Sequence, residues 1–251
     1  MVKFKPIFLN LLKMKASWLY LAFGMFPLIL FIVAFFNTNF MQLSGEKHAL
    51  SFLEFFSSVF VIQNNAVIPL VILTYIIGLN FYSEKIKGQL YFYKDLHRAK
   101  LFNSKLLSLI YLYLIFILIL LISSLILYYF HINNMELSAH RVFPSNMSDL
   151  QYVIIEFLGT FCIQILCIML AVLLSINLPN GYTILGVLAF FIISSIAPFL
   201  KSLKFIFPNR YQEQYTNSNF GSVIILIIGI FLAYTLIFYA ISVYKYKKLE
   251  F

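Results

Sequence analysis

The residues able to do chemistry are few in this chain, and their spacings match no catalytic or metal-binding motif. The pattern G-x-x-x-x-G-K-[ST], which cradles nucleotide phosphates, does not occur, so we expect no ATP hydrolysis by this chain. His131, Glu136 and His140 are not spaced as two metal ligands on one helical face would be. No G-x-S-x-G occurs, and neither Cys162 nor Cys167 has a histidine nearby. We therefore predict no catalytic residue, no metal site and no cofactor in this chain.

A carboxylate at the middle of a membrane helix is typical of proton- and ion-coupled carriers. Glu156 is the one charged residue within the six apolar runs of the chain, and it lies near the start of its run. We interpret it as an interfacial carboxylate that faces the outer headgroups or the basic outer loop. Without an internal ionisable group, the energy for transport has to come from another subunit.

The composition requires lipid as the surrounding solvent. Of the 251 residues, 62% are hydrophobic and 11% are charged, whereas a soluble domain averages about 45–50% and about 25%. These values exclude a disordered chain, a disulfide scaffold and a nucleic-acid-binding module. A helix that crosses the membrane needs about 20 apolar residues. The predicted spans are 18–36, 61–82, 106–130, 152–176, 182–200 and 221–244.

The predicted fold is an all-α integral membrane protein with six transmembrane helices. Lys and Arg side chains concentrate in cytoplasmic loops. With the N-terminus cytoplasmic, 13 of the 18 Lys and Arg residues lie in inside segments, and five lie outside. Both termini are therefore predicted to be cytoplasmic. The net charge of +9 is mainly a signal of topology, and nucleic acid is not expected as a partner.

Residues 1–17 are predicted to form an amphipathic helix that precedes a transmembrane domain over 18–251. Phe4, Ile7, Phe8, Leu11 and Leu12 follow the i, i+3, i+4 spacing of one helical face. Such a helix lies flat at the membrane interface, with its lysines toward anionic headgroups. It either anchors the first span or contacts a partner subunit.

The longest polar segment on the cytoplasmic side is 83–105, which contains six Lys and Arg residues. A connection between two neighbouring helices needs only a few residues. A basic, aromatic-rich segment of this length indicates a docking surface for a partner, and a solvated charged loop is the alternative.

The pattern resembles the membrane permeases of type-two ABC exporters, which have six spans, an elbow helix before the first span and a long cytoplasmic loop after the second. The local pattern in that loop is also similar, with Glu84 directly after the span, Gly88 four residues on and Lys105 at the start of the third span. The resemblance implies a coupling loop over 83–105 that docks on a separate ABC ATPase subunit, which would hold the ATP and magnesium. The docking residues it implies are Glu84, Gly88, Asp95, Arg98 and Lys105.

The resemblance also implies that spans two and five line a translocation path at the interface with a second permease chain, as a homodimer or heterodimer. The polar and small residues placed on that path are Thr74, Gly78, Ser194 and Ser195. An apolar path suits a hydrophobic or amphipathic cargo, because charged groups would lack partners in it. The chain is most similar to Gram-positive peptide-export and self-immunity permeases of the phenol-soluble modulin type, in the bacterial plasma membrane.

Two other classes stay open at this point. One is a channel or secondary carrier that works without ATP. The other is an integral-membrane enzyme that modifies lipid, for which His97, His131 and His140 are the candidate catalytic groups.

Overall fold

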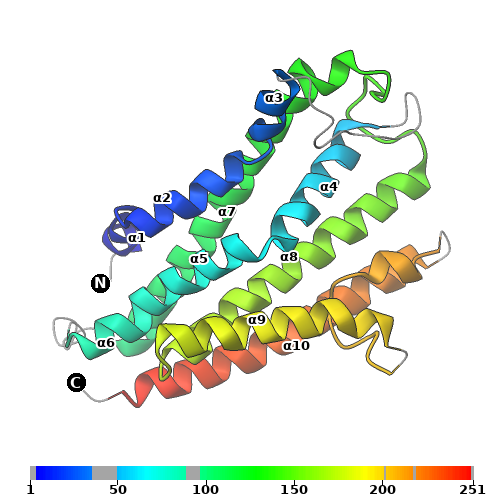
Figure 1. Ribbon diagram of the computed structural model, residues 1–251. Helices are drawn as coiled ribbons and strands as arrows, with labels where there is room; N and C mark the ends of the chain where they lie inside the picture. Colours follow the sequence, from blue (N-terminus) through cyan, green and yellow to red (C-terminus); the bar gives the residue numbers. More distant parts are fainter. Residues whose placement is uncertain (1–3, 36–49, 89–96, 201, 217–218, 250–251) are drawn as a thin grey trace.

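The computed structural model describes residues 4–35, 50–88, 97–200, 202–216 and 219–249. These residues form a bundle of long helices (Figure 1), and the described part of the chain contains no β-strand. The α-helices are α1 (Phe4–Leu12), α2 (Lys15–Ala22), α3 (Leu28–Phe35), α4 (Phe52–Asn65), α5 (Val67–Gly78), α6 (Glu84–Ile86), α7 (Arg98–Phe130), α8 (Met147–Ser175), α9 (Asn180–Ile196) and α10 (Phe220–Lys247). The short helical turns are η1 (Phe23–Met25), the π-helical η2 (Leu79–Ser83), η4 (Ile132–Asn134), η5 (Ala197–Phe199) and η6 (Tyr211–Gln214).

One end of the bundle carries α1, α6 and the C-terminal end of α10, and we name it the α6 end (Figure 1). The starts of α4, α8 and α10 lie at the opposite end. Helix α8 is the central element, because it packs against α4, α5, α9 and α10. The main hydrophobic core lies around it and includes residues of α5, α7 and α8.

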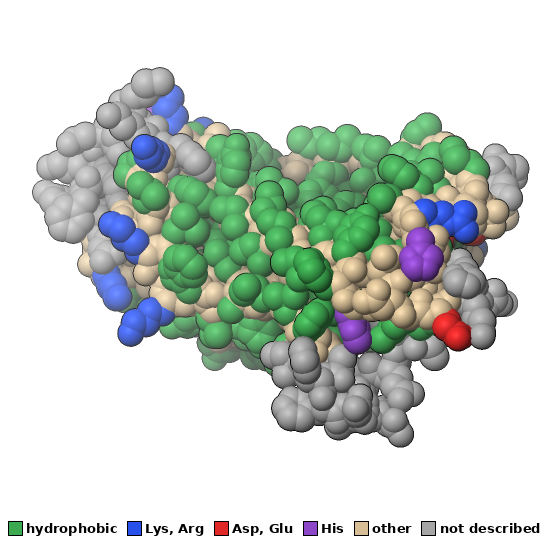
Figure 2. Space-filling model, turned by 90° about the horizontal axis from the view of Figure 1, so that it is seen from above, with side chains coloured by type: hydrophobic (Ala, Val, Ile, Leu, Met, Phe, Trp, Pro, Cys, Tyr) green, Lys and Arg blue, Asp and Glu red, His purple; other side chains and the backbone are tan. Residues whose placement is uncertain are grey.

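The chain has the architecture of a multi-pass membrane protein. By length and composition, five helical segments in the described part of the chain could cross a membrane. They are Val67–Ile86, Arg98–Asn134, Met147–Ser175, Asn180–Phe199 and Phe220–Lys247. Figure 2 shows hydrophobic side chains over the middle of one face and charged side chains toward its two ends, which is the distribution a bilayer requires.

The first predicted span, 18–36, is not one continuous helix in its described part. It is divided into α2, η1 and α3, and the division falls at Pro27. Proline has no N–H, and its ring clashes with the carbonyl four residues earlier, which here belongs to Phe23. The run 18–36 is therefore long and apolar enough for one span, but its described part does not form one unbroken helix.

The second predicted span, 61–82, is broken for the same reason. Helix α4 ends at Asn65, Ala66 is extended with φ −67° and ψ 120°, and α5 begins at Val67. Pro69 is four residues after Asn65, so a continuous helix would place its ring against the Asn65 carbonyl. The crossing segment is therefore Val67–Ile86, while α4 packs separately against α7 and α8.

Side chains of neighbouring helices bond the carbonyls near both breaks. The Gln63 Nε2 on α4 donates to the Phe23 carbonyl at 2.8 Å, and the Gln164 Nε2 on α8 donates to the Asn64 carbonyl at 3.0 Å. Both amide side chains are buried. Neighbouring helices thus supply donors to a backbone carbonyl near each break.

Two helices begin earlier than predicted. Helix α7 begins at Arg98 and not at 106, so the C-terminal part of the predicted coupling loop 83–105 is helical. Helix α8 begins at Met147 and not at 152. Glu156 is consequently nine residues from the first residue of its helix, about 14 Å along the axis. It is not a carboxylate of the first turn.

The segment 1–17, predicted as one amphipathic helix, contains α1 over Phe4–Leu12, and a break at residues 13–14 separates α1 from α2. Helix α1 packs against α7. Leu11 is buried, and the Phe8 ring contacts the Tyr111 ring with a centroid distance of 6.2 Å. Lys5, Lys13 and Lys15 are exposed. The apolar side of α1 is thus held on the bundle, and the lysines face outward.

Gly159 provides a test of how α8 packs. A Cβ atom added there would lie 2.8 Å from the Pro208 carbonyl oxygen and 3.3 Å from the Asn209 Cα. Because both are backbone atoms, we expect Gly159→Ala to destabilise the protein by about 1–3 kcal/mol. Gly229→Ala on α10, where nothing lies within 4 Å, is the matched control and should leave the melting temperature in detergent unchanged or raised. Equal melting temperatures for the two variants would contradict this packing.

Candidate functional site

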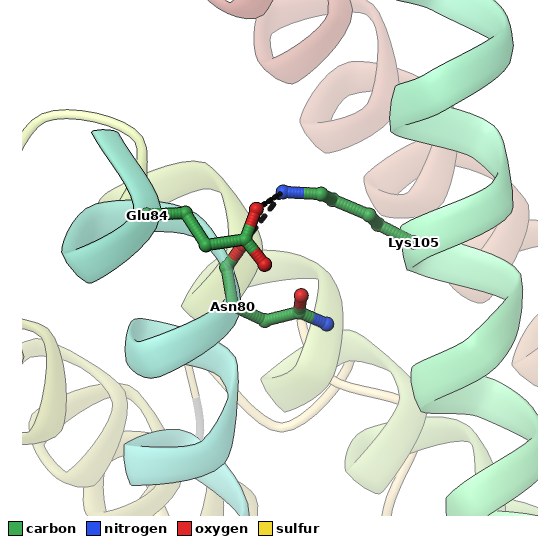
Figure 3. A network of polar contacts seen from close by, with 3 residues as sticks. All are labelled: Asn80, Glu84 and Lys105. Atoms are coloured by element: carbon green, nitrogen blue, oxygen red, sulfur yellow. Dashed lines mark hydrogen bonds and ion pairs between the residues drawn. The ribbon is translucent and has the colours of Figure 1, made fainter. Parts of the chain in front are cut away.

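An ion pair joins the two ends of the predicted coupling loop (Figure 3). The Lys105 Nζ on α7 lies 2.5 Å from the Glu84 Oε2 on α6. The same Nζ donates to the Asn80 carbonyl at 2.8 Å. The Lys105 side chain is 1% exposed and the Glu84 side chain is 19% exposed. Breaking so buried a pair leaves an uncompensated charge, so the interaction holds the end of one crossing segment to the start of the next.

The local structure that presents these groups is the π-helical turn η2. A π-turn departs from the α-helical hydrogen-bond register and occurs mostly as a single turn within an α-helix. Here it precedes Glu84 directly and contains Asn80, whose carbonyl the lysine bonds. The Lys105 ammonium also lies 5.3 Å from the centre of the Phe81 ring. One turn of the chain therefore supplies a carbonyl and an aromatic ring to one ammonium group.

Two further cations of this segment bond the C-terminal ends of other helices. The Lys85 Nζ donates to the Ile176 carbonyl at the end of α8, at 3.3 Å. The Arg98 Nη1 donates to the Lys247 carbonyl at 2.7 Å, and also to the Leu249 carbonyl, at the end of α10. The C-terminal end of a helix dipole is negative, so these positions favour cations.

These contacts change the roles expected for the predicted docking residues. Lys105 is buried, so it does not present its charge to a partner, and Arg98 is directed toward the end of α10. Both side chains bond other parts of the chain itself. Asp95 lies outside the described residues. The cations of this segment that the structure shows exposed are Lys87 and Lys100.

Gly88 ends the helical turn of α6. Its φ is +66°, which is in the left-handed region, and its N–H donates to the Lys85 carbonyl at 3.1 Å. No atom lies within 4 Å of the position a Cβ would take. Glycine is therefore required here by backbone conformation and not by space.

The four residues predicted to line a translocation path do not come together. Gly78 faces α9, where a Cβ would lie 2.2 Å from the Asn180 Oδ1, and the buried Thr74 hydroxyl donates to the Leu70 carbonyl. Ser194 and Ser195 both donate to the Phe191 carbonyl. Ser194 is 14 residues after Asn180 on α9, about 21 Å along the axis. Within the single chain, Gly78 packs against α9. The hydroxyls of Thr74, Ser194 and Ser195 bond carbonyls of their own helices.

The three histidines considered for lipid chemistry are also separated. His97 precedes α7 at the α6 end, whereas His131 and His140 lie in the connection between α7 and α8 at the opposite end. The His140 Nδ1 is 2.8 Å from the Asn133 Oδ1. Among the described residues no three His, Cys, Asp or Glu side chains lie close enough to share a metal ion.

The α6 end therefore carries exposed Lys87 and Lys100 beside the buried Glu84–Lys105 ion pair. Comparisons with protein-family models, curated proteins and solved structures found no match to this chain. Sequence reasoning missed that Asn80 and Lys85 help to hold this end together. No residue spacing signals these two contacts, because each depends on a carbonyl of a folded helix.

Lys105→Met tests the clamp. The change leaves Glu84 without its cation in a mostly buried position, and we expect a loss of about 3–5 kcal/mol in the free energy of unfolding. Lys100→Met, an exposed position on the same helix, should change it by less than about 0.5 kcal/mol. The measurement is denaturant unfolding in detergent micelles. A similar small change in both variants would show that the ion pair does not stabilise the fold.

Gly88 gives a local test by proteolysis. Gly88→Val places a β-branched residue at positive φ, at a cost of about 1–2 kcal/mol, whereas Gly88→Asn is tolerated there. We expect trypsin to cleave after Lys87 at least about fivefold faster in the Val variant, because cleavage follows the population of the opened turn. The Asn variant should resemble the unchanged protein. Equal cleavage of the Val and Asn variants would contradict the assigned conformation.

Proposed function

We propose that this chain is the permease subunit of an ABC exporter and that a separate ATPase subunit docks at the α6 end. The observation that carries the proposal is the Glu84–Lys105 ion pair, which clamps the two ends of the segment predicted to couple the subunits. ATP-driven movement has to pass from the ATPase to the membrane helices through a firm contact. A segment fixed to two crossing helices meets this requirement.

The distribution of exposed lysines supports docking at the α6 end. Lys87 and Lys100 flank the segment, and Lys13, Lys15, Lys245, Lys247 and Lys248 are exposed at the same end. In the proposal this end is cytoplasmic, in agreement with the positive-inside rule. The complementary surface of the ATPase would be acidic, since opposite charges favour encounter and fix register.

The proposed cargo is a hydrophobic or amphipathic peptide, and the proposed membrane is a bacterial plasma membrane. In the most apolar part of α10 almost no residue is fully buried within the single chain, and in that of α9 most residues are not. These apolar faces are available to lipid or to the second permease chain that the proposal includes. A path between two such chains would have few charges, which suits a cargo of this kind.

A carrier that works without an ATPase is the second candidate. The observation in its favour is Glu156, which lies about 14 Å along α8 and not at its first turn. Ion-coupled carriers commonly use such a carboxylate.

Charge reversal tests the docking surface. Lys87→Glu/Lys100→Glu should weaken co-purification with an ABC ATPase encoded beside this chain by about tenfold or more, because it opposes two favourable charge contacts. Arg141→Glu/Lys204→Glu makes the same change in net charge at the opposite end of the bundle and should leave association intact. Unaltered association of the first variant, or equal loss in both, would overturn the assigned surface.

A further inference from the structure

Two cavities meet at Glu156, away from the α6 end. The outer cavity has a volume of about 310 Å³ and lies between α4, α8 and Tyr215. The inner cavity has a volume of about 200 Å³ and lies between α4, α8, α9 and the segment before and within η6. Glu156 is the residue that lines both. We name the two together the Glu156 chamber.

The outer cavity has three carboxylates in its wall, from Glu54, Asp149 and Glu156. Their hydrogen-bond donors are neutral groups. Glu54 accepts from the Ser51 hydroxyl and N–H, and Glu156 accepts from the Ser57 hydroxyl at 2.8 Å. Asp149 accepts from the Asn146 amide and the Ser148 hydroxyl. Among the described residues no cationic nitrogen lies within 4.0 Å of these three groups.

Among the described residues, Arg210 is the one cation that lines the chamber, and it has its own partners. The Arg210 guanidinium lies 3.5 Å from the Glu213 carboxylate and 4.9 Å from the centre of the Phe199 ring. It therefore forms its ion pair with Glu213 and not with Glu156. Carboxylates in a partly buried position carry a desolvation cost, and a cation in the chamber would offset it.

One residue that lines the inner cavity holds a buried acceptor, which a ligand could bond only after a shift of the side chain. The Asn209 side chain is 8% exposed and lines this cavity, and its Oδ1 has no hydrogen-bond partner. Its Nδ2 donates to the Ser194 carbonyl at 3.0 Å, so the amide is held with one acceptor free. An unmade bond of a buried acceptor is costly, and a donor that reached it after such a shift would remove that cost.

The end of α4 adds to the negative potential. Asn64 and Asn65, the last two residues of α4, line the inner cavity next to the break at Ala66. The C-terminal end of a helix dipole carries a partial negative charge, which favours a cation nearby. Carboxylate and helix end thus both favour the same kind of ligand.

The volume of the outer cavity and the aromatic rings that line both cavities indicate the size and chemical class of the ligand. A water molecule occupies about 30 Å³, so a single bare ion would fill only a small part of a cavity of about 310 Å³. Tyr152 and Tyr215 line the outer cavity and Phe191 lines the inner one. Aromatic faces attract cations and also pack against apolar groups.

We propose that the Glu156 chamber binds a primary ammonium group carried on an apolar body, with the Glu156 carboxylate accepting its N–H bonds. The aromatic side chains contact the rest of the ligand. The proposal concerns binding by the chain alone, so its test does not depend on whether an ATPase docks.

The test uses 2-phenylethylamine, which is cationic at pH 7, and its neutral counterpart 2-phenylethanol. The purified full chain in phosphatidylcholine nanodiscs is titrated with each compound by calorimetry, against empty nanodiscs. The amine should bind more tightly than the alcohol. Glu156→Gln keeps an acceptor for Ser57 but removes the charge, and it should weaken binding of the amine by about tenfold or more while leaving the alcohol unchanged.

Two further variants keep the test decisive. Glu136→Gln changes an exposed carboxylate at the same end that does not line the chamber, and it should bind the amine as the unchanged chain does. Asp149→Asn, near the start of α8, should weaken the amine severalfold even if the Glu156 variant fails to fold. Equal binding of amine and alcohol, or no effect of the Glu156 and Asp149 variants, would overturn the proposal. Displacement of the amine by micromolar Ca²⁺ would also overturn it, in favour of a metal site.

Discussion

The structure depends on one constraint, which is that polar groups within an apolar helix bundle have to find their partners inside it. Each break and each end of a helix in the bundle exposes carbonyl groups. Buried amides satisfy the carbonyls near the breaks at Pro27 and Pro69, and cations satisfy those at the helix ends. Lys105 does so for Asn80 and is neutralised by Glu84. The same requirement therefore shapes both the middle of the bundle and the α6 end.

This constraint explains why the two candidate sites differ. At the α6 end Lys85, Arg98 and Lys105 bond carbonyls and a carboxylate of the chain itself. We propose that the exposed lysines at this end contact another protein. In the Glu156 chamber the carboxylates bond only hydroxyl, amide and backbone N–H groups, and a buried acceptor on Asn209 stays unbonded. The first site is complete without a ligand, whereas the second has unmet charge and an unmet hydrogen bond. A bound organic cation would supply the missing charge.

The helical membrane class could be predicted from the sequence, because apolar runs of membrane length directly require it. The last two predicted spans agree to within three residues with the helical segments Asn180–Phe199 and Phe220–Lys247, since Pro179 precedes α9 and a polar segment precedes α10. The breaks were missed because membrane helices tolerate proline, and only packing decides where a helix divides. The inward direction of Lys105 was missed because its partner is 21 residues away in sequence. The polar face of α8 was readable, since Glu156, Thr160 and Gln164 follow i, i+4, i+8 spacing.

The central claim is that this chain moves its cargo only with an ATPase bound at the α6 end. The most direct measurement is export of a fluorescent amphipathic peptide by proteoliposomes that contain the purified permease, with and without the partner ATPase. The account predicts transport that requires the ATPase and hydrolysable ATP, and no transport when an ion gradient alone is imposed. Transport by the permease alone, driven by a proton or sodium gradient, would contradict it.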